Sequence, residues 1–164
     1  MSGTPVEIYE RLDLPPMTVR DAVMRVMRSI GEREERYRDL TLAVELNGPG
    51  HAQLRVPIEA TVVNRPGRWE CGLHIEAAKS DIFFPTFDGT LSVTPDGGKE
   101  AELWLQGSYD PPGGVLGKGL DTILLHGTAE KSLREFLHWL AGEVKTEVDR
   151  SEQERIDQAR RYHG

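Results

Sequence analysis

The sequence has one cysteine, no long apolar run and no excess of positive charge, and each of these absences excludes a class of protein. Cys71 on its own can form neither an internal disulfide bond nor a cysteine-rich zinc site. The net charge of −7 comes from 20 lysines and arginines against 27 aspartates and glutamates. Such a chain lacks the basic surface that nucleic-acid binding requires, so we expect no nucleic-acid partner. Without a run of ~18 apolar residues, we also expect no integral membrane segment.

Motifs for targeting, catalysis and cofactor binding are missing too. Met1–Pro5 lacks the basic and apolar regions of a signal peptide, so we expect a cytoplasmic protein. The glycine-rich run 113–119 has neither the first glycine nor the Ser/Thr of a phosphate-binding P-loop, and no G-x-S-x-G occurs. Glu135 and His138 have the spacing of half a di-iron motif, but the second half is absent. We therefore expect no metal and no cofactor.

The N-terminal two thirds of the 164 residues predict a strand, a helix and then further strands. Alternating apolar residues over Val6–Leu12 predict a strand that ends before two prolines. Helical spacing of apolar residues from Val19 to Ile30 predicts an amphipathic helix, with Thr18 as its N-cap. From Leu40 to Tyr109 the apolar residues alternate between short turns. This pattern predicts an antiparallel meander with one buried face.

The C-terminal third predicts one long helix. Its apolar stripe runs from Leu120 to Val148, which is 29 residues or about 43 Å at ~1.5 Å per residue. The segment 150–164 is charged and has only Ile156 and Tyr162 as large apolar residues. We therefore predict that it is an exposed helical extension.

The end of the predicted sheet and the long helix resemble a known superfamily. The pattern consists of Leu105-x-Gly107-x-Tyr109-x-Pro111-Pro112, then Gly117 and Asp121, then Ala129 and Phe136-Leu137-x-x-Leu140. It is similar to uncharacterised bacterial members of the START-like (SRPBCC) superfamily, which also includes Bet v 1-like pollen-allergen proteins and polyketide cyclases. The resemblance implies an α+β helix-grip fold, in which a curved antiparallel sheet of six or seven strands wraps around the C-terminal helix. It also implies a single START-like domain over residues 1–149.

A cavity between sheet and helix, as this superfamily commonly has, would hold a hydrophobic or amphipathic small molecule such as a lipid. The first hypothesis is therefore a binding protein with a transport or sensing role. Its ligand-binding residues are predicted from the apolar faces of the strands and of the long helix: Val56, Ile58, Leu73, Ile75, Phe87, Leu103, Leu105, Tyr109, Leu124 and His126.

Two other functions compete with this hypothesis, because the fold alone does not select one. A regulatory or interaction protein would have a filled core and would act through Trp104 or the charged extension. Trp104 is out of phase with the buried alternation, so we expect it on the outer face, where it would support a homodimer. A cofactor-independent cyclase or dehydratase would use His126 and Tyr109 as its catalytic pair. Glu59 or Glu76 would join them only if the strand register differs.

Overall fold

The computed structural model describes residues 3–31, 38–45, 51–65, 68–75, 86–110 and 122–164. Side chains are described over 3–28, 69–75, 86–110 and 130–164. The elements, in chain order, are β1 (Thr4–Leu12), α1 (Pro16–Gly31), β2 (Arg38–Glu45), β3 (His51–Arg65), β4 (Arg68–Ile75), β5 (Thr86–Asp96), β6 (Glu100–Asp110) and α2 (Thr122–Tyr162).

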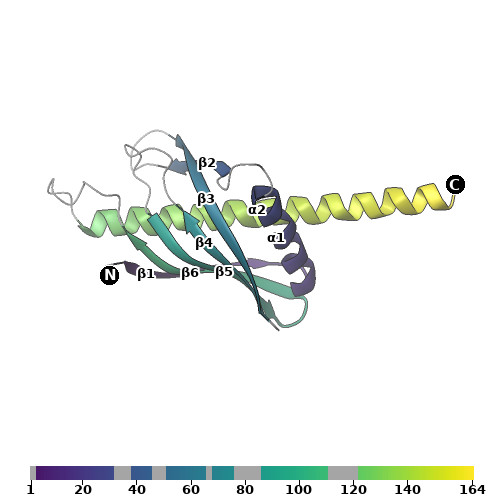
Figure 1. Cartoon of the computed structure of the whole chain (residues 1–164), viewed down its shortest axis with the longest axis horizontal. Coiled ribbons are helices and arrows are strands. Elements are labelled where there is room, and N and C mark those ends of the chain that lie inside the picture. Colours follow the sequence, from purple (N-terminus) through teal and green to yellow (C-terminus); the bar gives the residue numbers. More distant parts are fainter. Residues whose placement is uncertain (1–2, 32–37, 46–50, 66–67, 76–85, 111–121) are drawn as a thin grey trace.

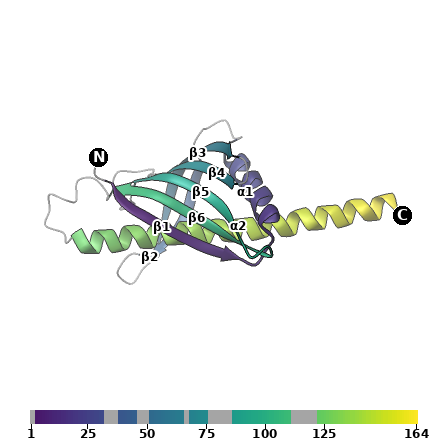
Figure 2. The ribbon, with the colours of Figure 1, turned by 90° about the horizontal axis from the view of Figure 1, so that it is seen from below.

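The strands form one antiparallel sheet in the order β1-β6-β5-β4-β3-β2. Strands β2 to β6 follow one another as a meander, and β1 pairs with the last strand of the chain. Figures 1 and 2 show α2 running across the sheet, with α1 beside it. The predicted combination of an antiparallel sheet with a C-terminal helix is confirmed. Four strands, β1, β4, β5 and β6, are described with their side chains, fewer than the six or seven strands predicted.

One face of the sheet is buried, and we call it the inner face. Alternate residues of β1, β4, β5 and β6 point into a hydrophobic cluster, as a strand period of two requires. The two helices supply the other side of this cluster. From α1 come Val19, Val23 and Met27, and from α2 come Leu133, Phe136, Leu137, Leu140 and Val144.

Two glycines lie opposite each other on neighbouring strands of this face. Gly89 of β5 pairs with Gly107 of β6. A Cβ atom on Gly107 would lie 2.2 Å from the Asp88 carbonyl oxygen, and one on Gly89 would lie 2.5 Å from Cζ of Phe87. Only glycine therefore allows the two backbones to approach this closely and lets the Phe87 ring lie over them.

Helix α1 begins earlier than the sequence predicts, so the assignment of Thr18 as N-cap is wrong. The helix begins at Pro16, and the Val19 N–H donates to the Pro15 carbonyl oxygen at 3.0 Å. Proline suits this first helical position because its missing N–H would have no partner there and its φ is already helical. The prolines that end β1 therefore also start the helix.

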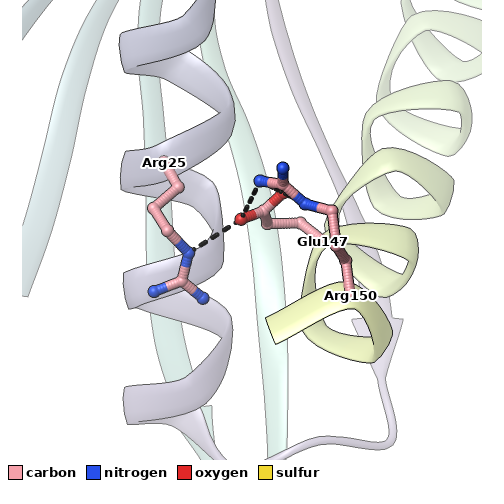
Figure 3. Close-up of polar contacts among 3 residues, drawn as sticks. All are labelled: Arg25, Glu147 and Arg150. Carbon is pink, nitrogen blue, oxygen red and sulfur yellow. Dashed lines mark hydrogen bonds and ion pairs between the residues drawn. The ribbon is translucent and has the colours of Figure 1, made fainter. Parts of the chain in front are cut away.

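An ion-pair cluster joins α1 to α2 (Figure 3). The Arg25 Nε–H of α1 donates to Glu147 Oε1 of α2 at 2.9 Å. Arg150, one turn further along α2, donates to the same carboxylate at 2.7 and 2.9 Å. The Glu147 side chain is only 11% exposed, and a carboxylate with so little contact to water needs its charge compensated. The guanidinium groups of Arg25 and Arg150 provide this compensation.

Helix α2 contains both the predicted long helix and its predicted helical extension, as one continuous element. It has 41 residues, or about 60 Å at ~1.5 Å per residue, whereas an 11-residue strand such as β6 spans about 36 Å. The helix must therefore extend beyond the sheet, and Figure 1 shows its C-terminal part doing so. All residues from Glu152 onward are exposed. No helix in the described ranges is long and apolar enough to cross a membrane.

Candidate functional site

The inner face brings together six of the ten predicted ligand-binding residues. They are 0–3% exposed and belong to one cluster: Leu73, Ile75, Phe87, Leu103, Leu105 and Tyr109. Strand pairing arranges them in rows across β4, β5 and β6, for example Ile75 beside Phe87 and Phe87 beside Tyr109. The sequence located this face correctly because the strands alternate without interruption. Whether these residues contact a ligand stays a prediction.

The other four predicted residues have side chains outside the described set. Val56 and Ile58 belong to β3, where the backbone pairs Ile58 with Ile75 of β4. Leu124 and His126 belong to the first turns of α2. The catalytic pair of His126 and Tyr109 therefore stays a prediction. The glycine-rich run 113–119 and Glu76 also lie outside the described residues, and the register pairs Glu59 with His74.

Tyr109 is buried at the end of β6. Burial, together with the negative charge of Glu130 on α2, raises the pKa of its phenol above the usual 10. The hydroxyl therefore keeps its proton at neutral pH and can donate a hydrogen bond. The sequence indicated Tyr109 but not its acidic neighbour Glu130.

Trp69 carries a buried polar atom for which the described part of the chain supplies no partner. The residue lies on β4 in the row of Val93 and Leu103, and it is 1% exposed. Its indole Nε1 is buried and makes no hydrogen bond. This N–H is the only polar group of the side chain. Burying it away from water without a hydrogen-bond partner costs about 1–3 kcal/mol. Trp69 alternates with Cys71, Leu73 and Ile75 in the sequence, which indicates the inner face, but the missing acceptor depends on packing and has no sign in the sequence.

Cys71 lies two residues along β4 from Trp69 and is fully buried. Burial raises the pKa of its thiol from 9.0 to about 11. The thiol is therefore protonated at neutral pH, as is typical of a cysteine that packs as a small apolar residue. We assign no chemistry to it.

A groove of about 330 Å³ lies along the edge of the sheet, between β1 and α2. Ile8 and Leu137 are its buried apolar residues, and its charged residues are Lys131 and Arg134 together with Glu10 and Glu135. Across the groove, His138 Nδ1 lies 2.7 Å from Glu10 Oε1. From the sequence, only Glu135 was considered together with His138, because of their three-residue spacing. The signal for the contact was Glu10 itself, a carboxylate among the buried residues of β1.

On the strands described with their side chains, β1, β4, β5 and β6, the outer face of the sheet is mainly polar and carries one aromatic pair. Trp104 lies on this face, as predicted, and stacks on Tyr9 of β1 with ring centroids 4.7 Å apart. Its indole Nε1–H donates to Glu102 at 2.8 Å. Tyr9 covers part of the Trp104 ring and is itself 48% exposed. The exposed aromatic surface is therefore centred on the edge strand β1 rather than on Trp104 alone.

Solved structures share this fold. A conserved protein from Geobacillus kaustophilus aligns with 87% of this chain and 96% of its own, at 14% identity and a TM-score of 0.55. Ara h 8.0201 aligns with 90% of this chain and 98% of its own, at 9% identity and a TM-score of 0.50. The Zhui aromatase/cyclase from Streptomyces sp. R1128 gives a TM-score of only 0.44, at 12% identity over 90% of this chain and 96% of its own.

These comparisons show the fold and nothing finer. No family model matches the chain, and no curated protein sequence matches it significantly. The likeness to Ara h 8.0201, a Bet v 1-like protein, confirms the helix-grip fold that the sequence pattern resembles. At identities this low, ligands and activities do not transfer from one protein to another.

Proposed function

We propose that the protein binds a hydrophobic or amphipathic small molecule between the inner face of the sheet and α2, in a transport or sensing role. The observation that carries the proposal is the buried Trp69 N–H without an acceptor. Buried donors in proteins nearly always have a partner. A bound molecule with an oxygen atom near Trp69 would provide the missing one.

The arrangement of the inner face defines the class of ligand. Trp69 lies at one end of β4, and Ile75, six residues away and in the row of Tyr109, lies ~20 Å along the strand. The Trp69 N–H and the Tyr109 hydroxyl are the polar groups at the two ends, and the face between them is apolar. Contact of this face with an alkyl chain contributes about 0.8 kcal/mol per buried CH₂ group. We therefore expect an elongated apolar molecule with a hydrogen-bond acceptor. Its walls would be the ten residues predicted from the sequence.

Native mass spectrometry on protein purified without detergent, followed by organic extraction, tests this proposal. We expect one extra molecule per chain that is lost on denaturation and recovered in the extract. Trp69→Phe removes the N–H and keeps an aromatic ring, so we expect the affinity to fall about two- to tenfold, the value of one hydrogen bond. Trp104→Phe is the matched control because the same change is made on the outer face.

Two results would contradict the proposal. A ligand that binds equally well to the Trp69→Phe protein would place the site elsewhere, for example in the groove between β1 and α2. A Trp104→Phe protein that loses the ligand while the Trp69→Phe protein keeps it would place the site on the outer face.

A second candidate function is a regulatory or interaction protein with a filled core. It is favoured by the complete burial of Phe87, Leu91 and Leu105. These side chains are 0% exposed and belong to the same hydrophobic cluster as residues of both helices. The part of α2 beyond the sheet would then be a surface for protein contacts. Xenon binding discriminates between the two functions, since a filled core takes up no xenon whereas an apolar cavity does.

A further inference from the structure

The open edge of β1 is the surface from which we draw a further inference. Strand β1 pairs with β6 on one side and with no described strand on the other. An edge strand of this kind presents unpaired backbone N–H and C=O groups to which another strand can pair. The groove between β1 and α2 runs beside this edge.

We propose that β1 pairs antiparallel with β1 of a second copy, centred on Tyr9, so that two sheets become one. On the outer face, this register places Glu7 opposite Arg11 of the other chain, and Arg11 opposite Glu7. The two Tyr9 side chains meet at the two-fold axis. On the inner face, Val6 lies opposite Leu12. Opposite charges and apolar side chains at facing positions each stabilise an antiparallel pair.

Charge selects this register over its neighbours. A pair centred on Glu10 would place two glutamates opposite each other, and one centred on Glu7 would do the same. A pair centred on Arg11 would oppose two arginines. A pair centred on Ile8 has no opposite-charge pair on the outer face. The register centred on Tyr9 is the one that gives two attractive charge pairs and no repulsive one.

The surroundings of β1 fit this arrangement. Glu7, Tyr9 and Arg11 are exposed, whereas Val6, Ile8 and Leu12 are buried, so the two faces of the strand are distinct. Arg11 already lies 3.3 Å from Asp96 and 3.5 Å from Glu102 within its own chain, which holds the guanidinium on the outer face. Its five N–H groups leave donors for a further carboxylate.

Charge reversal followed by mixing tests the proposal. Sedimentation velocity over a wide concentration range should show a reversible dimer of the unmodified chain. Glu7→Arg and Arg11→Glu should each weaken dimerisation by about tenfold or more, because two cross-strand attractions become repulsions. Mixing the two variants should restore dimers, since each changed residue then faces an opposite charge. Glu143→Arg, an exposed reversal on α2, is the matched control and should change nothing.

Each other outcome overturns the proposal. A chain that stays monomeric at the highest concentration has no such interface. A dimer that both variants leave intact uses another surface, such as the Trp104 face or the end of α2. Dimers lost in both variants but not restored on mixing contradict the antiparallel register. If Arg11→Glu alone lowers the melting temperature through its lost contacts with Asp96 and Glu102, Glu7→Arg tests the interface by itself.

Discussion

At the scale of single residues, replacing glycine by alanine should have opposite effects on stability in the sheet and in the helix. Gly107→Ala should destabilise the protein by about 1–3 kcal/mol, because the new Cβ would lie 2.2 Å from the Asp88 carbonyl oxygen and 2.6 Å from Gly89 Cα, both backbone atoms. Gly142→Ala is the control on α2. Its Cβ would meet nothing within 4 Å, so alanine should stabilise the helix by about 1 kcal/mol. Urea unfolding measures both, and a neutral Gly107→Ala would contradict the close approach of β5 and β6.

A second residue-scale prediction concerns the pH dependence of stability. Because burial raises the pKa of Cys71 from 9.0 to about 11, the folded state keeps the thiol proton at pH values where the unfolded chain releases it. The thiol therefore lowers the free energy of unfolding by about 1.4 kcal/mol per pH unit between pH 9 and pH 11. Cys71→Ala should remove this part of the slope in urea titrations. Parallel slopes for the two proteins would show that the thiol is not buried.

Single residues also show how far the sequence predicts the site. Alternation placed Leu73, Phe87 and Leu105 on the inner face because a buried strand face repeats every second residue. The unpaired Trp69 N–H could not be predicted, since a hydrogen-bond partner depends on neighbours distant in sequence. Glu10 is a charged residue at a position of β1 where the alternation requires an apolar one. This exception was the sign of its contact with His138 of α2, 128 residues away.

At the scale of elements, the Glu147 carboxylate fixes α1 against α2. Glu147→Gln should lower stability by about 1 kcal/mol, because Arg25 and Arg150 both lose their charged acceptor, and their own exposure limits the effect. The loss should shrink in high salt. Glu143→Gln, one turn earlier and exposed, is the matched control and should change stability by less than about 0.5 kcal/mol. Equal losses in both variants would exclude the ion-pair cluster as the cause.

Element boundaries were predicted less well than element types. The strand and the helix at the N-terminus were both expected, but the helix begins at Pro16 rather than after Thr18. Two prolines end a strand and also suit a helix start, so one pattern has two meanings. The long helix was recognised from its apolar stripe up to Val148. Beyond that residue the stripe fades because no sheet lies beneath the helix, although the helix itself continues to Tyr162.

At the scale of the whole molecule, the end of α2 should be dispensable for folding. We predicted that residues 150–164 form an extension beyond the domain of residues 1–149, and all residues from Glu152 onward are exposed. Removal of residues 151–164 should therefore change the free energy of unfolding by less than about 1 kcal/mol. Circular dichroism during urea unfolding measures this, and a large loss of stability would show that the extension packs on the domain.

The central claim, a ligand on the inner face that satisfies Trp69, is tested most directly by NMR of the indole N–H groups. In ¹⁵N-labelled protein, the Trp69 signal is identified as the one missing from the Trp69→Phe variant. We predict that the organic extract of the purified protein, or a medium-chain fatty acid, moves this signal downfield by hydrogen bonding and leaves the Trp104 signal in place. A Trp69 signal that stays unmoved by both would contradict the account.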